Sequence, residues 1–118
     1  MKQPLTIGFI GLGLIGGSIA KAIRYYYPDT RIIAHTRSQA TIDYALNEQI
    51  IDIACDQVDV RFSECDYIFL CAPVEANASY LKILKPLIQP DCILTDVGST
   101  KTDIHTHVAD LGLESQFI

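Results

Sequence analysis

The sequence predicts an α/β fold in a single domain of 118 residues, built on a doubly wound parallel sheet. Three observations support this prediction. Short β-branched runs alternate with segments in which apolar residues recur with the helical period of about 3.6 residues. Hydrophobic residues make up 49% of the chain, which suits a sheet covered on both faces. The first apolar run passes directly into a glycine-rich turn and then into a helical pattern, as in a βαβ unit.

The glycine-rich turn indicates a dinucleotide site. A strand over residues 5–10 leads without a spacer into Gly-Leu-Gly-Leu-Ile-Gly at residues 11–16. Gly11 permits a sharp turn, Gly13 has no side chain that would keep a pyrophosphate from the backbone, and Gly16 allows close packing of helix and strand. The free N–H groups and the positive dipole end of the following helix then face an anion. Because the flanking strand and helix are both predicted, we favour this interpretation over a purely structural turn.

The second strand, predicted over residues 31–36, ends where dinucleotide-binding folds usually carry an acidic residue that binds the adenine ribose hydroxyls and favours NAD. Thr36 stands at this position, and Arg37 and Ser38 follow it. Arg37 can pair with a 2′-phosphate, and the hydroxyls of Thr36 and Ser38 can donate to it, so NADP is favoured over NAD. The alternative is that Arg37 is solvated and Ser38 caps the helix predicted over residues 39–47.

The remaining elements continue the alternation of a Rossmann-type fold. Strands are expected, weakly, over residues 50–54, then over 66–71 and 92–97, with a further strand opening at residues 117–118. Helices are expected over residues 14–27, over 75–88 with a kink or early end at Pro86, and from about residue 101 to Gly112; residues 56–65 are expected to be a loop with a helical turn. One or two of the tyrosine rings at residues 25–27 are expected to pack, and the rest to be exposed.

Charge and composition exclude several partners. The net charge of −5 and the scattered lysines and arginines argue against nucleic acid and anionic membranes as partners. No apolar run approaches the roughly 20 residues of a membrane span, and the short segment before the first strand is not expected to be a signal peptide, so a cytoplasmic location is expected.

The cysteines and histidines do not suggest a metal site. The cysteines lack C-x-x-C spacing and are interpreted as small apolar side chains in a reducing compartment; they are Cys55, Cys65, Cys71 and Cys92. His105 and His107 are two residues apart on a predicted helix and face different ways, so they make a poor pair of ligands.

Three segments together closely resemble the N-terminal nucleotide-binding domain of the prephenate/arogenate dehydrogenases, the tyrosine-pathway enzymes. They are the glycine segment at residues 7–18, Cys-Ala-Pro-Val at 71–74 and Thr-Asp-Val-Gly-Ser-Thr-Lys at 95–101. The resemblance covers essentially the whole chain, residues 1–118. It implies oxidative decarboxylation of prephenate to 4-hydroxyphenylpyruvate, or of arogenate to tyrosine, with hydride transfer to a bound NAD or NADP.

The resemblance also implies roles for individual residues. Ser99 corresponds to the family's serine beside the substrate hydroxyl, and Lys101 belongs to the same motif; the capping-box spacing from Thr100 to Asp103 gives this segment an alternative, structural role. The cofactor-binding residues are expected to be Gly11, Gly13, Leu14, Ile15 and Gly16 at the pyrophosphate, Thr36, Arg37 and Ser38 at the adenosine end, and Ala72, Pro73 and Val74 on the nicotinamide side.

Two departures from the family matter. The family's catalytic histidine lies in a Gly-x-His-Pro-Met segment after the strand that would begin at Phe117, and its helical C-terminal domain carries the homodimer interface. Neither is in this sequence, so we expect a part of a two-domain enzyme that binds cofactor but is inactive by itself. The second departure is Thr36 at the acidic position. Another NAD(P)-dependent hydroxyacid dehydrogenase or reductase, and a non-catalytic dinucleotide sensor, remain alternatives.

Overall fold

The computed structural model describes residues 4–97 and 102–118. Its strands are β1 (Thr6–Ile10), β2 (Arg31–His35), β3 (Ile53–Ala54), β4 (Tyr67–Leu70) and β5 (Ile93–Asp96). Its α-helices are α1 (Leu14–Tyr26), α2 (Gln39–Asn47), α3 (Val74–Leu84) and α4 (Thr102–Asp110), and its 3-10 helices are η1 (Val60–Glu64) and η2 (Glu114–Gln116). The predicted alternation of strands and helices is confirmed.

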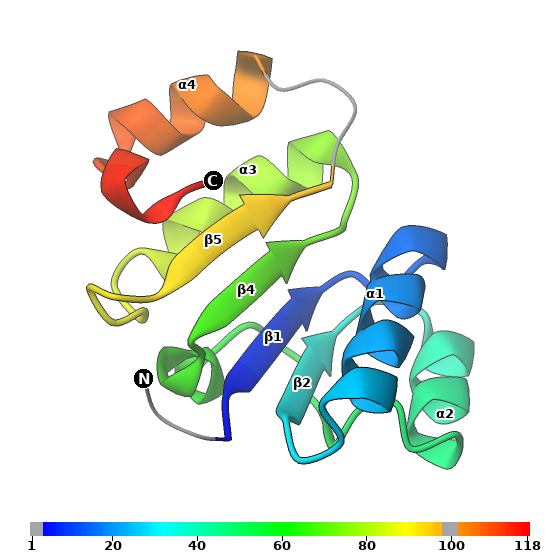
Figure 1. Cartoon of the computed structure of the whole chain (residues 1–118). Helices are drawn as coiled ribbons and strands as arrows, with labels where there is room; N and C mark the ends of the chain where they lie inside the picture. The colour runs from blue at the N-terminus through cyan, green and yellow to red at the C-terminus, as the bar shows by residue number, and fades with distance from the viewer. Residues whose placement is uncertain (1–3, 98–101) are drawn as a thin grey trace.

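The described strands form one parallel sheet in the order β3-β2-β1-β4-β5 (Figure 1). The chain winds outward from β1 to β3 and then returns to place β4 on the other side of β1. The order therefore reverses beside the carboxyl end of β1. In open α/β sheets, such a switch point is where ligands bind. The predicted doubly wound sheet is confirmed.

Two apolar layers hold the sheet between its helices. On one face, Ile7 and Phe9 of β1 belong to a buried cluster with Ala20 of α1 and Ala45 of α2. On the other face, Ile10 belongs to a cluster that includes buried residues of β4, β5, α3 and α4. Successive β1 side chains point to opposite faces, so the strand is buried on both sides and reads as a continuous apolar run.

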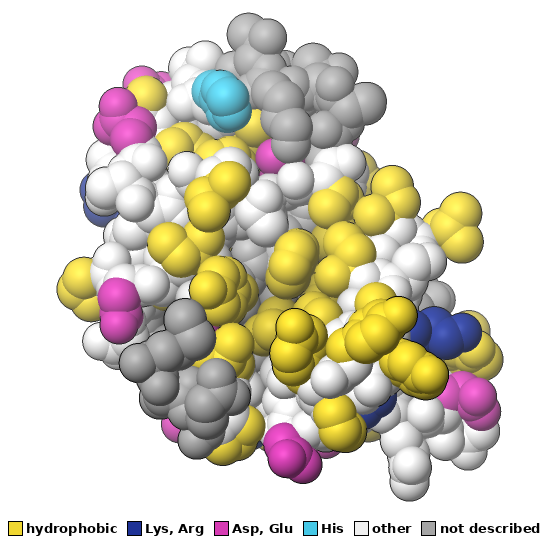
Figure 2. Space-filling model, in the orientation of Figure 1, with side chains coloured by type: hydrophobic (Ala, Val, Ile, Leu, Met, Phe, Trp, Pro, Cys, Tyr) yellow, Lys and Arg dark blue, Asp and Glu magenta, His cyan; other side chains and the backbone are white. Residues whose placement is uncertain are grey.

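One part of the sheet is left open on the α1 side. In Figure 1, α1 and α2 lie over β2 and the edge of β1, and no described helix covers β4 and β5 from that direction. Figure 2 shows hydrophobic side chains gathered on this face. A hollow of about 650 Å³ lies at its lower end, where its lining includes Ile7, Ile23, Tyr26, Tyr67 and Phe69.

The third strand is shorter than predicted, because residues 50 and 51 help to end α2. Gln49 adopts a left-handed φ of 59°, and the Ile50 N–H donates back to the Ala45 carbonyl at 2.8 Å. This is the hydrogen bonding of a helix C-terminus. Ile50 and Ile51 are nevertheless buried, so their apolar character reflects packing against the core.

The structure also tests the predictions for the three tyrosines, the end of α3 and the last strand. The interpretation of the three tyrosines was wrong, because Tyr25, Tyr26 and Tyr27 are all exposed, by 79%, 71% and 68%. α3 ends at Leu84, two residues before Pro86, as one of the two predicted outcomes. Phe117 forms a parallel bridge with Leu94 of β5, where the opening of a further strand is predicted. None of the described helices is both long and apolar enough to cross a membrane.

Candidate functional site

A cleft of about 250 Å³ opens at the switch point of the sheet, where the carboxyl ends of β1, β2 and β4 meet. Its walls come from the turn between β1 and α1, the turn after β2, the turn after β4 and the first turns of α3. Its lining residues are Gly11, Leu12, Gly13, His35, Thr36, Arg37, Cys71, Ala72, Pro73, Ala76 and Tyr80. Six of the residues predicted to bind a cofactor are therefore brought together here: Gly11, Gly13, Thr36, Arg37, Ala72 and Pro73.

The turn after β1 is tied to both neighbouring strands. The Gly11 N–H donates to the His35 carbonyl at 2.7 Å, and the Cys71 N–H donates to the Ile10 carbonyl at 2.7 Å. Gly11 has a φ of +88°, and a Cβ there would lie 2.7 Å from the backbone nitrogen of Ala72. Only glycine fits this position without strain or a shift of the β4 turn.

The other two glycines of the motif have different surroundings. A Cβ on Gly16 would lie 2.8 Å from the Gly11 carbonyl oxygen and 3.1 Å from the Cys71 Cβ, so Gly16 permits close packing of α1 against the turns. A Cβ on Gly13 would meet no described atom within 4 Å. Gly13 stands at the N-cap of α1, which no described side chain caps. The space above Gly13 and the uncapped helix end suit an anion.

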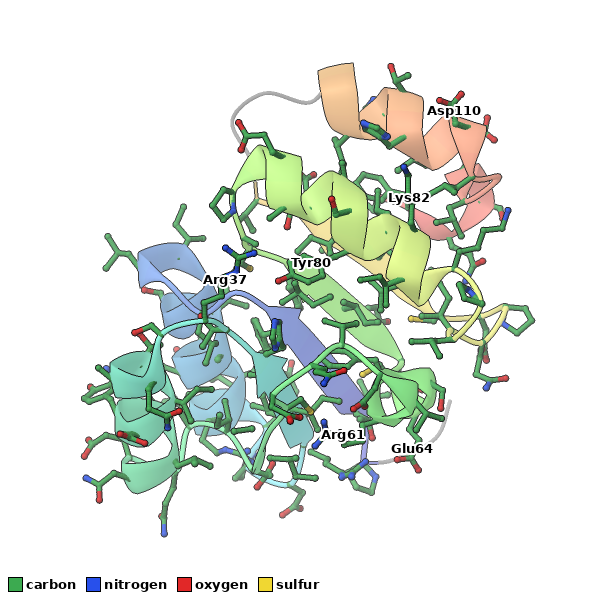
Figure 3. The ribbon with its side chains drawn as sticks, turned by 180° about the vertical axis from the view of Figure 1, so that it is seen from behind. Arg37, Arg61, Glu64, Tyr80, Lys82 and Asp110 are labelled. Atoms are coloured by element: carbon green, nitrogen blue, oxygen red, sulfur yellow. The ribbon has the colours of Figure 1, made fainter. Side chains whose placement is uncertain are left out.

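The turn after β2 carries an exposed cationic side chain. Arg37 is exposed and forms no ion pair with another described residue. Figure 3 shows Arg37 and Tyr80 reaching the same region from two elements, the turn after β2 and α3. The Ser38 Oγ accepts a hydrogen bond from the Thr41 N–H at 3.2 Å and so caps α2, as in the structural alternative for this residue. Ser38 lies outside the cleft lining.

The remaining predicted residues lie elsewhere. Leu14 and Ile15 are exposed by 89% and 55%, and neither lines the cleft. Leu14 borders a neighbouring hollow of about 530 Å³ between α1 and α2, which shares Leu12 and Gly13 with the cleft. Val74 begins α3. Ser99 and Lys101 lie outside the described residues.

Sequence reasoning missed a polar pair in the cleft wall. The His35 Nδ1 lies 3.0 Å from the Cys55 carbonyl oxygen, and its Nε2 lies 3.2 Å from the Tyr80 hydroxyl oxygen. The two rings meet edge to face, with centroids 5.7 Å apart. Tyr80 falls among the apolar positions of its helix, so the periodicity predicts a core residue and gives no signal of this contact.

The buried Asn77 side chain forms a hydrogen bond with the turn after β4. It is 2% exposed, and its Nδ2 donates to the Ala72 carbonyl at 2.9 Å. A second carbonyl, that of Leu70, lies 3.4 Å away. A buried amide that satisfies backbone acceptors holds the turn at the cleft in one conformation.

The cysteines of the described region are free thiols. Burial raises the pKa of Cys71 to about 11 and that of Cys92 to about 12, and it also raises the pKa of Cys65. These groups are therefore protonated at neutral pH and behave as small apolar side chains. The described residues contain no cluster of three or more His, Cys, Asp or Glu side chains that could hold a metal ion.

Comparison with known proteins identifies the family. Residues 19–118 match the family model described as prephenate dehydrogenase, nucleotide-binding domain. The chain belongs to this family. The match excludes the glycine motif, so the motif and the family model are separate observations that agree.

Two relatives illustrate the extent of the similarity. The chain is 37% identical over 113 residues to the prephenate dehydrogenase of Bacillus subtilis, a match that covers 95% of this chain and 30% of the relative. Synechocystis arogenate dehydrogenase superposes with a TM-score of 0.81 at 34% identity, covering 91% of this chain and 37% of that structure. The chain spans about a third of the length of the curated relatives it matches.

A third similar protein was crystallised with a dinucleotide. The prephenate dehydrogenase of Aquifex aeolicus, in complex with hydroxyphenyl propionate and NAD+, superposes with a TM-score of 0.86 at 25% identity. The superposition covers 98% of this chain and 41% of that structure. The resemblance predicted from the three sequence segments is thus confirmed.

Proposed function

We propose that the chain binds NADP, and NAD less tightly, in the cleft at the switch point, as the cofactor-binding domain of a prephenate dehydrogenase. The observation that carries this proposal is the open space above Gly13, at the uncapped end of α1 and in the same cleft as the exposed cation of Arg37. Family membership and the NAD+ complex of the Aquifex relative support a dinucleotide site, without bearing on the preference for NADP. Thr36 stands where an acidic residue would favour NAD.

The residues present fit such a cofactor. The N–H groups at the start of α1 would bind the pyrophosphate, Arg37 would pair with a 2′-phosphate, and the turn at Ala72 and Pro73 would border the nicotinamide ring. Three other predicted residues do not line the cleft and would contribute only by forming the first turn of α1; they are Leu14, Ile15 and Gly16. When bound, the dinucleotide supplies the hydride acceptor of an oxidation.

We assign prephenate as the substrate, with oxidative decarboxylation to 4-hydroxyphenylpyruvate as the reaction, because two of the curated relatives are named prephenate dehydrogenases. Arogenate is the alternative, favoured by the similarity to the Synechocystis enzyme. Ser99 and Lys101 are the candidates for contact with the substrate, on the resemblance of their motif.

Titration calorimetry with NADP and NAD at fixed salt tests the cofactor assignment. We expect NADP to bind at least tenfold more tightly, a difference of about 1.4 kcal/mol. Arg37→Ala should remove this preference and leave NAD binding nearly unchanged, because only NADP carries the 2′-phosphate. Lys21→Ala, on α1 outside the cleft lining, is the matched control. Tighter binding of NAD by the unmodified chain would refute the NADP preference, and binding of neither would refute the site.

A further inference from the structure

The contact between His35 and Tyr80 fixes the direction of a hydrogen bond in the cleft wall. His35 is the last residue of β2, and its ring lies between the Cys55 carbonyl and the Tyr80 hydroxyl. A carbonyl oxygen can only accept a hydrogen bond, so the Nδ1 atom, 3.0 Å from it, carries a hydrogen, and in an imidazole with one ring hydrogen the Nε2 atom carries none. The Nε2 atom is then an acceptor, and the Tyr80 hydroxyl donates its only hydrogen to it across 3.2 Å.

This arrangement leaves the Tyr80 oxygen as an acceptor toward the cleft. A phenolic hydroxyl has one hydrogen and retains acceptor capacity when it donates. Tyr80 and His35 both line the cleft, and Tyr80 is half-buried there. A ligand group that meets this oxygen must therefore be a hydrogen-bond donor. An acceptor at the same point would face the lone pairs of the phenol and lose its bond to water.

We propose that the Tyr80 hydroxyl, oriented by His35, recognises the 6-amino group of the adenine base. This inference rests on the proposed function, in which the ribose lies at Thr36 and Arg37. From there the base enters the part of the cleft walled by Ala76 and Tyr80 of α3, with Arg37 reaching the same region (Figure 3). Adenine joined to a ribose has a single strong N–H donor, its 6-amino group. Tyr80 is thus a specificity-determining residue and His35 a positioning residue.

Base preference is the readout that tests this assignment. The probes are NADP and its hypoxanthine analogue, in which an acceptor oxygen replaces the amino group. We expect the unmodified chain to prefer NADP. Tyr80→Phe should weaken NADP binding by about 3- to 10-fold, the usual value of one neutral hydrogen bond, without weakening the analogue. The ratio of the dissociation constant of the analogue to that of NADP then approaches unity. His35→Phe, which keeps a ring but removes both nitrogen atoms, should also lower this ratio.

The outcomes separate this inference from the proposed function. Tyr25→Phe, at an exposed tyrosine on α1, is the control and should bind both dinucleotides as the unmodified chain does. An unmodified chain that binds neither dinucleotide refutes the proposed function. An unmodified chain that binds both equally, or a Tyr80→Phe variant that keeps the full adenine preference, overturns the recognition of the amino group while the dinucleotide site stands. A matched thermal denaturation of each variant verifies its fold.

Discussion

Alanine substitution at Gly13 and at Gly16 is expected to separate cofactor binding from stability. The two glycines belong to one motif and are three residues apart, yet a Cβ meets different surroundings at each. At Gly13 it enters space with no described atom within 4 Å. At Gly16 it would lie 2.8 Å from the Gly11 carbonyl oxygen, a backbone atom. The first change should block the ligand, and the second should disturb the fold.

The expected energies follow from these surroundings. At Gly13, alanine is a poorer N-cap than glycine, which costs up to about 1 kcal/mol. The lower entropy of the unfolded chain offsets this by about 0.4–1 kcal/mol, so the net change should be within about 1 kcal/mol. At Gly16, the methyl group must displace α1 from the turns, and overpacking of this kind costs about 1–3 kcal/mol. For a domain of this size, that lowers the melting temperature by roughly 4–12 °C.

Thermal denaturation followed by circular dichroism, with calorimetric titration of NADP below the transition, measures both effects. Gly13→Ala should melt within about 4 °C of the unmodified chain and bind NADP at least tenfold less tightly, because the methyl group keeps the pyrophosphate from the backbone. A Gly13→Ala chain that binds NADP normally would refute this reasoning. So would one that melts as early as Gly16→Ala, since no contact in the described structure could account for the loss.

Three further expectations concern the turn after β4, the thiols and one acidic side chain. Asn77→Ala should lower the free energy of unfolding, measured in urea, by about 1–3 kcal/mol. The control Asn47→Ala, at an exposed position of α2, should change it by less than about 0.5 kcal/mol. Equal losses in the two variants would contradict the role of the buried amide. Alkylation of Cys71 should accelerate about tenfold per pH unit from neutral pH toward its pKa of about 11, as followed by mass spectrometry, and a plateau near neutral pH would show an unperturbed thiol. Hydrogen bonds from the Arg61 side chain and backbone lower the pKa of Asp59 to about 2, below its value in the unfolded chain. The ionised Asp59 therefore stabilises the fold at pH values above its ordinary pKa, and this stabilisation is lost as the pH falls toward about 2. Asp59→Asn should accordingly melt earlier than the unmodified chain at neutral pH, and the two melting temperatures should converge in acid; a constant difference would contradict this account.

The sequence predicts correctly those parts of the structure that depend on residues close together in the chain. The first strand, the glycine turn and the first helix follow one another without a gap, so each supports the identification of the next. Gly11 is an example. Its positive φ and its close approach to the Ala72 backbone can be adopted without strain only by glycine, so the glycine in the motif already indicates a sharp turn at this position. The same holds for Ser38, whose capping hydrogen bond is a contact within one helical turn.

Features that depend on distant parts of the chain were not predictable. The pair of His35 and Tyr80 joins residues 45 positions apart, and its existence depends on how α3 packs against the sheet. Ile50 and Ile51 have the composition of a strand, yet the left-handed Gln49 turns their backbone back onto α2. Hydrophobicity predicts that these isoleucines are buried, but it does not predict which backbone groups they pair with.

The most direct test of the dinucleotide site is its location by NMR. The backbone amide shifts of the ¹⁵N-labelled chain would be compared with and without NADP. We predict that the largest changes fall on the turn at Gly11 and Gly13, on Thr36 and Arg37, and on the start of α3 near Ala76, which together surround the cleft. Changes centred on the hollow between α1 and α2, or no saturable changes at all, would contradict the assignment of the cofactor to the switch point of the sheet.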